Sequence, residues 1–170
     1  MVGKAAMIAG LILAAGVPAT ASADDPADGW DVQNVGQACR MVSTFEDNVT
    51  IGLIWTPETK DLEFLAFGDD WKKVAGQAGS SVPINLKFDG KVPHDDWTAD
   101  HASVIPIGSS KVAVVADFGP TLATELANTV SSSQSVAVTV GGKRIGSYDL
   151  GGSPAAYQLL MRCGEQIAAR

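Results

Sequence analysis

The chain contains only two cysteines, and they lie far apart: Cys39 stands near the start of the predicted folded part, and Cys163 stands close to the C-terminus. Two cysteines at opposite ends fit a single disulfide bond that ties both ends of one domain together. Loop-closure entropy makes such a bond worth about 4 to 5 kcal/mol, because the loop that it closes is long. Two free thiols, or a bond to another chain, are the alternatives. We expect the Cys39–Cys163 disulfide, which restricts the chain to folds whose first and last elements are neighbours.

The stretch that carries Cys163, residues 153–170, has the pattern of an amphipathic helix. Ser153 is suited to the N-cap and Pro154 to the first helical position, where no amide donor is needed. Apolar residues recur at helical spacing and share one face: Ala156, Leu159, Leu160, Cys163 and Ile167. Gly164 lowers helix propensity by about 1 kcal/mol relative to alanine, so the last turn is expected to fray or end early. A cysteine on the buried face suits a structural disulfide better than a reactive thiol.

Residues 1–23 have the pattern of a secretory signal peptide. Lys4 is the only basic residue, residues 5–17 are apolar, and Ala21-Ser22-Ala23 is a small-x-small cleavage site. The apolar run is shorter than the roughly 20 residues that span a bilayer, so we expect no membrane span once the signal is removed. Residues 24–29 would then form a flexible leader, and residues 30–170 a single domain. Export would place the protein in the periplasm or outside the cell, where disulfides persist.

The chain is acidic, with 19 Asp and Glu residues against 12 Lys and Arg and a net charge of −7. Removal of the signal would take away one lysine and no acid, which makes the charge more negative. Nucleic acids and anionic lipids are bound by positive surfaces. The composition therefore argues against both as partners.

Short apolar segments of strand length follow one another along the rest of the chain, several with alternating apolar and polar residues. We expect strands at residues 39–45, 49–55, 62–67, 82–88, 102–107, 111–118, 135–140 and 143–150. Segment 111–118 is apolar on nearly both faces, which favours a central strand. The connections are mostly of hairpin length. The sequence therefore predicts a mainly β fold (β-rich α+β), an antiparallel sandwich or partly closed barrel with two or three short helices, including the C-terminal one.

Two shorter helical segments are expected before the C-terminal helix. One is a turn at residues 71–75. The other is a helix at residues 121–128, with Leu122 and Leu126 pointing inward and the serines at 131–133 breaking it. Residues 91–100 are polar and are expected to form a loop anchored by Trp97.

Both histidines of the chain lie in one polar group, His94-Asp95-Asp96 followed by Asp100-His101. Imidazole and carboxylate together bind divalent metals or transfer protons. A small metal-dependent or hydrolytic enzyme that uses His94, Asp96, Asp100 and His101 is therefore the alternative function. A solvated loop is the simpler interpretation, because a metal site needs fixed geometry. We assign no catalytic residue and expect no cofactor.

Other motifs carry less chemistry. Asp117-Phe118-Gly119 has the spelling of the magnesium-binding triplet of protein kinases, but the motifs that must accompany it are absent, as is a Gly-x-Ser-x-Gly elbow. The four tryptophans could line a ligand groove, although isolated tryptophans in a small β-domain are more often packing residues. They are Trp30, Trp55, Trp71 and Trp97.

Residues 147–163 resemble the C-terminal pattern of the invasion-associated locus B family, small exported bacterial proteins found mainly in alphaproteobacteria. That pattern is a strand, a Leu-x-Gly-small turn, an Ala-rich helix and often a cysteine. The matching residues are Tyr148, Asp149, Leu150, Gly151, Gly152, Ser153, Pro154, Ala155 and Ala156, followed by Leu160 and Cys163. The likeness extends loosely to Cys39, Trp71 and Phe88-Asp89-Gly90. The resemblance implies export, a disulfide and a β-rich fold, and such families are described as host-interaction factors or as uncharacterised proteins, without shared catalytic residues.

Together these features favour a non-enzymatic exported domain that binds a protein or another partner at the cell envelope or outside the cell. The absence of a catalytic constellation favours binding over catalysis without excluding an enzyme. A purely structural accessory subunit of an envelope assembly is a third interpretation.

Overall fold

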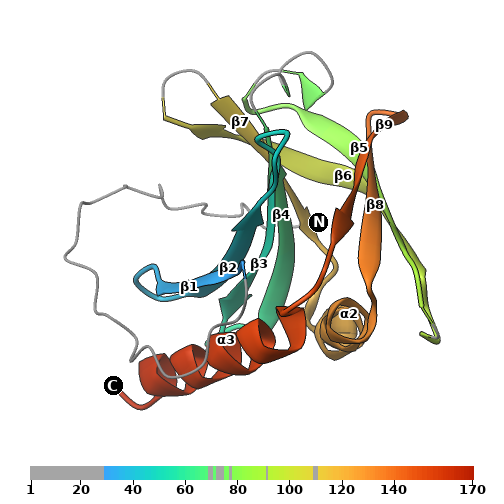
Figure 1. The fold of residues 1–170 in the computed structure, drawn as a ribbon. Helices are drawn as coiled ribbons and strands as arrows, with labels where there is room; N and C mark the ends of the chain where they lie inside the picture. The colour runs from blue at the N-terminus through green and yellow to red at the C-terminus, as the bar shows by residue number, and fades with distance from the viewer. Residues whose placement is uncertain (1–28, 69–70, 72–74, 77, 91, 109–110) are drawn as a thin grey trace.

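The computed structural model describes residues 29–68, 71, 75–76, 78–90, 92–108 and 111–170. These residues form nine strands in one antiparallel sheet, together with two helices labelled α2 and α3 (Figure 1). The predicted signal peptide, residues 1–23, and most of the predicted leader, residues 24–29, lie outside the described residues. No helix within the described ranges is long and apolar enough to cross a membrane.

The strands run in the order β1-β2-β3-β4-β7-β6-β5-β8-β9 along the sheet. Their bounds are β1 Asp31–Asn34, β2 Cys39–Thr44, β3 Thr50–Thr56, β4 Asp61–Phe67, β5 Ser81–Phe88, β6 Asp96–Ile107, β7 Lys111–Asp117, β8 Ser135–Val140 and β9 Lys143–Asp149. β7 lies between β4 and β6, which confirms the prediction that segment 111–118 is central. The β8–β9 hairpin turns at Gly141 and Gly142, whose φ angles of 58° and 78° suit the primed turns that match strand twist.

The sheet bends around a core but is not closed into a barrel. β1 and β9 are its two ends, and the strand order places no ladder between them. Figure 1 shows the two halves of the sheet turned toward each other, with both helices at one end of the space between them. The predicted mainly β fold with an antiparallel sheet and a C-terminal helix is confirmed, in a sandwich-like open form.

One large core fills the space between the two halves of the sheet. It takes side chains from the inner faces of the strands and from both helices, because alternate strand residues point inward. Its largest fully buried members include Met41, Leu53, Leu62, Ile84, Leu86, Leu126 and Leu160. Burying each such side chain is worth about 1.5 to 3 kcal/mol, so this core is the main source of stability.

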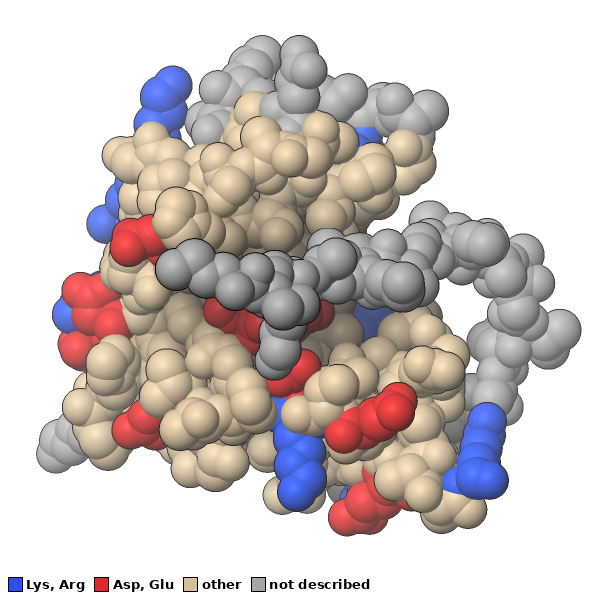
Figure 2. All heavy atoms as spheres, turned by 180° about the vertical axis from the view of Figure 1, so that it is seen from behind, with Lys and Arg blue, Asp and Glu red and all other residues tan. Residues whose placement is uncertain are grey.

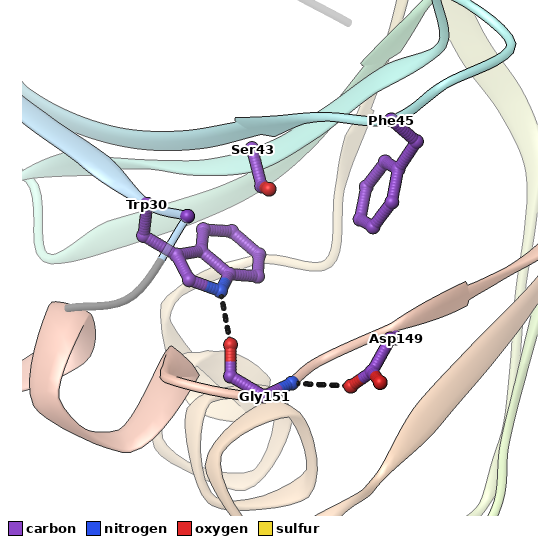
Figure 3. A pocket seen from close by; sticks show the side chains of 6 residues that line it. Trp30, Ser43, Phe45, Asp149 and Gly151 are labelled. Atoms are coloured by element: carbon purple, nitrogen blue, oxygen red, sulfur yellow. Dashed lines mark hydrogen bonds between the residues drawn. The ribbon is translucent and has the colours of Figure 1, made fainter.

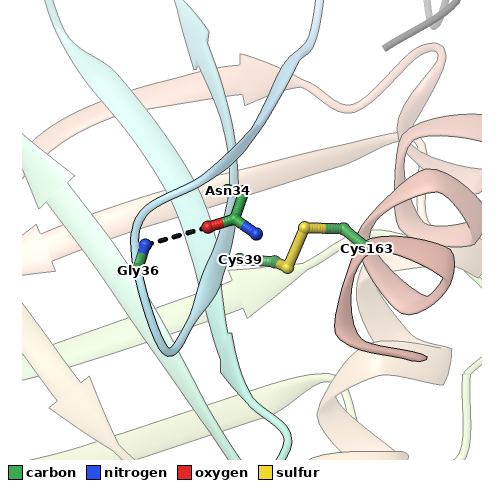
Figure 4. The surroundings of a disulfide bond; sticks show 4 residues. All are labelled: Asn34, Gly36, Cys39 and Cys163. Atoms are coloured by element: carbon green, nitrogen blue, oxygen red, sulfur yellow. Dashed lines mark hydrogen bonds between the residues drawn. A yellow bond between two sulfur atoms is a disulfide. The ribbon is translucent and has the colours of Figure 1, made fainter. Parts of the chain in front are cut away.

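The disulfide predicted between Cys39 and Cys163 is present (Figure 4). It joins the first residue of β2 to α3, Ser153–Ala168, and the two Cα atoms lie 6.1 Å apart. α3 also contacts β1, β2 and β3, so the last helix packs on the first strands. The disulfide therefore reinforces the packing contact between α3 and the first strands.

Two features of α3 differ from the prediction. The N-cap is Gly152, in a left-handed conformation, and Ser153 is the first helical residue. The Ser153 hydroxyl is buried and donates to the Val130 carbonyl over 3.2 Å, which ties α3 to α2. Gly164 does not end the helix early, since α3 continues to Ala168. A Cβ atom added at Gly164 would lie 2.6 Å from ring atoms of Trp55 in β3, so the glycine allows a close approach between α3 and the sheet.

The predicted second helix is longer than expected. α2 spans Pro120–Ser132, and its serines bond back to carbonyls of the preceding turn: Ser131 Oγ donates to Ala127 over 2.8 Å. The serines therefore do not break the helix where predicted. Leu126 is fully buried as expected, but Leu122 is 39% exposed and does not point inward. The helical turn predicted at residues 71–75 is described only at its two ends, Trp71 and Ala75. The Ala75 N–H donates to the Trp71 carbonyl over 2.7 Å, which agrees with a helical turn.

The predicted loop at residues 91–100 is wrong for its second half, where β6 already begins at Asp96. Asp96 pairs with Lys87 and Trp97 with Leu86, and the buried Trp97 alternates with exposed Asp96 and Thr98. The alternation was hard to recognise because the outward positions carry the polar residues Asp96 and Thr98 and the inward ones carry only Trp97 and Ala99.

Candidate functional site

A pocket of about 310 Å³ lies where the two ends of the sheet approach each other (Figure 3). Its lining comes from the chain just before β1, the end of β2, the turn after it, and the connection from β9 to α3. The lining residues are Gly29, Trp30, Ser43, Phe45, Asp149 and Gly151. Figure 3 shows Trp30 and Phe45 on opposite sides of the space, with Ser43 between them.

Two hydrogen bonds fix the side of the pocket that is formed by Trp30, Asp149 and Gly151. The Trp30 indole N–H donates to the Gly151 carbonyl over 2.9 Å, and the Gly151 N–H donates to Asp149 Oδ1 over 2.7 Å. This Asx-type turn leads into α3. The Ser43 side chain is buried, and no hydrogen-bond partner of its hydroxyl is found among the described residues. The pocket therefore presents the exposed Asp149 side chain and, between its two aromatic rings, the Ser43 hydroxyl, which has no partner among the described residues.

An aromatic contact and a hydrogen bond fix the side of the pocket that is formed by Phe45. The rings of Phe45 and Tyr148 lie 4.8 Å apart between centroids, and the Tyr148 hydroxyl donates to Asp47 Oδ2 over 3.2 Å. Asp47 is placed by the β2–β3 turn, where its Oδ1 accepts from the Val49 N–H and Asn48 takes a φ of 58°. Burial, assisted by the negative charge of Asp47, raises the pKa of Tyr148 far above its usual range. Tyr148 is therefore a neutral donor at physiological pH.

A second apolar cluster lies on the outer face of the sheet, away from the main core. We call it the outer patch: Val42, Ile54, Leu65, Phe67, Ile105, Ile107, Ala113 and Val115. Leu65 opposite Val115 and Phe67 opposite Ala113 place its centre on the neighbouring strands β4 and β7. Among the described residues, the cluster takes no side chain from either helix. Leu65, Ala113 and Val115 are buried within the cluster, and its other members are half-buried.

A row of polar side chains borders the outer patch. Arg40 is opposite Ile54, Ile54 is opposite Glu63, and Glu63 is opposite Asp117 on successive strands. Arg40 donates from Nη2 to Gln33 over 2.8 Å, but its Nε is buried without a hydrogen-bond partner in the described part of the chain. Burial raises the pKa of Glu63 above its usual range, and the nearby carboxylates of Asp117 and Asp61 raise it further. We call Arg40, Glu63 and Asp117 the polar margin.

The structure does not gather His94, Asp96, Asp100 and His101 into one site. All four are exposed, and Asp100 and His101 are successive residues of β6 at the irregularity opposite Pro83. His94 instead packs its ring on Trp97, 4.6 Å between centroids. Within the described ranges, no group of three or more His, Cys, Asp or Glu side chains is placed to hold a metal ion.

The acids beside His94 pair with a lysine. Lys87 Nζ lies 2.8 Å from Asp95 Oδ2 and 3.7 Å from Asp96 Oδ2. The hydrogen bond to Lys87 lowers the pKa of Asp95. These carboxylates are therefore engaged in a surface ion-pair group that joins β5 to β6.

Of the four tryptophans, only Trp30 lines the pocket described above. Trp71 and Trp97 are core residues, and Trp55 packs against Gly164. The packing interpretation thus holds for three of them.

Sequence reasoning missed Phe45 and Asp149 as pocket residues and the outer patch as a surface. Phe45 and Asp149 are brought together only by the bending of the sheet. No spacing of residues along the chain predicts that bend. The outer patch could have been predicted from segment 111–118. This segment is apolar on both faces, whereas only one face of a strand can contact the main core.

No protein-family model, curated protein or solved structure matches the chain.

Proposed function

We propose that the protein is an exported, non-enzymatic binding domain whose outer patch docks a protein that is apolar at the centre of its contact surface and basic at its edge. The observation that carries the proposal is the second apolar cluster, to which neither helix contributes a described side chain. A cluster of half-buried apolar side chains bordered by polar residues is a surface that a protein partner can cover. Half-buried Ile54, Phe67 and Ile105 are the anchors that we expect to become buried.

The polar margin supports a basic partner. Glu63 keeps a raised pKa because it is partly desolvated beside two other carboxylates, and a lysine or arginine of a partner would relieve that repulsion. The partner would also offer an acceptor to the buried Nε of Arg40, which has none among the described residues. Figure 2 shows acidic side chains at several places on the face opposite to the view of Figure 1, some of them near its middle. With a net charge of −7, a second copy of the same chain would be repelled, whereas a basic surface would be attracted.

Export is part of the same proposal. Disulfides persist in oxidising compartments, and Cys39–Cys163 is formed here. The signal-peptide pattern of residues 1–23 and the resemblance to the invasion-associated locus B family point the same way. We therefore propose a periplasmic or secreted protein of that type, with a partner at the cell envelope or outside the cell.

Site-specific photo-crosslinking tests the docking surface. A photoreactive residue is placed at Ile54 or Ile105 of the full chain, expressed in the bacterium that carries the gene, and adducts are analysed in periplasm and medium. The matched control position is Leu122, which is exposed on α2 and outside the outer patch. We expect one discrete protein adduct from positions 54 and 105 and none from position 122.

The identity of the crosslinked protein decides whether the docking proposal is supported. Support requires that the captured protein, once purified, binds the unmodified domain and that its affinity falls as salt concentration rises, as expected for a basic edge that contacts Glu63 and Asp117 of the polar margin. An adduct with the mass of two copies of this chain, equal labelling from position 122, or salt-independent binding would contradict the proposal.

A further inference from the structure

We propose that the pocket lined by Trp30, Ser43, Phe45 and Asp149 binds the ammonium group of a small organic cation. This site is distinct from the outer patch. Ser43 and Val42 are neighbours on β2, and side chains of successive strand residues point to opposite faces of the sheet. The two sites therefore lie on opposite faces of the same strand.

The walls of the pocket have the chemistry of a cation site. Trp30 and Phe45 project into the space from opposite sides (Figure 3), and the face of an aromatic ring attracts a cation within about 6 Å of its centre, most strongly for tryptophan. Both rings are half-buried and fixed, Trp30 by its hydrogen bond to Gly151 and Phe45 by its contact with Tyr148. A cation entering this space would meet preorganised aromatic surfaces.

The charge of the lining selects a cation. Asp149 contributes a carboxylate of which only Oδ1 has a hydrogen-bond partner among the described residues. Asp47, in the turn that follows Phe45, adds a second negative charge and accepts a hydrogen bond from the Tyr148 hydroxyl. No Lys or Arg is among the described lining residues. An anion would thus meet repulsion, and no described lining residue would compensate for it.

Ser43 favours an ammonium that still carries N–H groups. Its hydroxyl lies between the two rings and has no partner among the described residues, so it can accept a hydrogen bond from the ligand. The volume of about 310 Å³ is near the lower end of the range of about 300 to 1,000 Å³ typical of small-molecule sites. The structure therefore points to a primary alkylammonium, either a small free amine or the side chain of a lysine.

Titration with n-butylammonium chloride, followed by the indole N–H resonance of Trp30 in ¹⁵N-labelled protein, tests the site. The resonance is assigned by its loss in Trp30→Phe. We expect a saturable shift with a Kd on the order of 1 to 10 mM and a shift at least about fivefold weaker with the neutral isostere n-butanol. A parallel titration with Nα-acetyl-lysine amide distinguishes the two sources: tighter binding of this compound identifies a lysine side chain as the natural ligand, and tighter binding of butylammonium identifies a free amine.

Two matched variants complete the test. Asp149→Asn keeps an oxygen for the Gly151 N–H and removes the charge, so it should weaken butylammonium binding about fivefold to tenfold. Asp96→Asn removes an exposed carboxylate of β6, outside the pocket, and should leave binding unchanged. Phe45→Leu should weaken butylammonium more than butanol, because it keeps apolar surface but removes the ring. The proposal is overturned if butanol binds as well as butylammonium, if the two aspartate variants behave alike, or if no shift occurs at tens of millimolar.

Discussion

The indole N–H of Trp30 donates to the carbonyl oxygen of Gly151 over 2.9 Å and so joins the chain before β1 to the turn after β9. These strands are the two ends of the sheet and share no ladder. The Cys39–Cys163 disulfide makes a second connection between the same two regions, from β2 to α3. A hydrogen bond and a disulfide thus connect the first and last parts of the open sheet and hold it in its bent form. The pocket lies beside the Trp30–Gly151 hydrogen bond.

The disulfide should supply a large share of the stability. Replacing both cysteines, Cys39→Ala with Cys163→Ala, should lower the free energy of unfolding by about 4 kcal/mol, because the unfolded chain loses a constraint across a long loop. Urea unfolding with and without reductant measures this. The double variant should not respond to reductant. Equal urea midpoints of reduced and oxidised wild type would contradict the prediction.

Gly164→Ala should destabilise the protein although alanine is the better helix former. The added Cβ would lie 2.6 Å from the Trp55 ring, and overpacking of this kind costs about 1 to 3 kcal/mol, against a helix-propensity gain of about 1 kcal/mol. Thermal unfolding of a double-mutant cycle tests the cause. In the Trp55→Leu background the same glycine substitution should become neutral or stabilising; destabilisation of equal size in both backgrounds would show that the ring is not responsible.

Tyr148 should make stability fall at alkaline pH. In the unfolded chain the hydroxyl ionises near its ordinary pKa of 10, whereas in the folded protein burial and Asp47 hold the proton to higher pH. The stability that Tyr148 contributes is therefore complete below pH 10 and decreases as the pH rises above it. Free energies of unfolding between about pH 8 and 11 should decline less in Tyr148→Phe than in wild type.

At neutral pH Tyr148→Phe should also cost about 0.5 to 1.5 kcal/mol for the lost hydrogen bond to Asp47. Tyr157→Phe is the control at neutral pH, since no hydrogen bond from the Tyr157 hydroxyl is found among the described residues. A neutral-pH loss of the same size in both variants would argue against a specific role of the Asp47 contact.

Glu63→Gln should stabilise the isolated domain at neutral pH. The folded-state pKa of Glu63 is raised above its ordinary value of 4.5, so the unfolded chain releases this proton at lower pH than the folded one. Stability therefore falls as the pH rises from about 4.5 through the folded-state pKa and stays lowered above it. The gain from Glu63→Gln should vanish below pH 4.5 in pH-dependent unfolding curves. Glu58→Gln, at an exposed position, should show no such gain; a pH-independent effect of Glu63→Gln would refute the account.

Much of the fold could be predicted because it depends on local patterns. Alternation identified most strands, the two-sided apolar character of residues 111–118 placed them in the centre of the sheet, and the glycine pair at 141–142 marked a hairpin. The start of β6 was missed where its outward positions are polar, since a polar run alone favours a loop.

The sites depend on contacts between distant residues, which no local pattern records. Gly164 looked like a weak point because propensity does not include the Trp55 ring that lies against it. Phe45 and Asp149 meet at one pocket only because the sheet bends. The His94–His101 segment drew attention by residue type, but extended backbone from Asp96 onward spreads its side chains along a strand.

The affinity of the crosslinked partner for two matched variants is the sharpest test of the outer patch as the docking surface. Ile105→Asp puts a charge into the outer patch, whereas Leu122→Asp puts the same charge on an exposed position of α2. After both variants are shown to melt near the wild-type temperature, calorimetric titration should give a Kd at least about tenfold weaker for Ile105→Asp and within about twofold of wild type for Leu122→Asp. Equal affinities of the two variants would mean that the outer patch is not the docking surface.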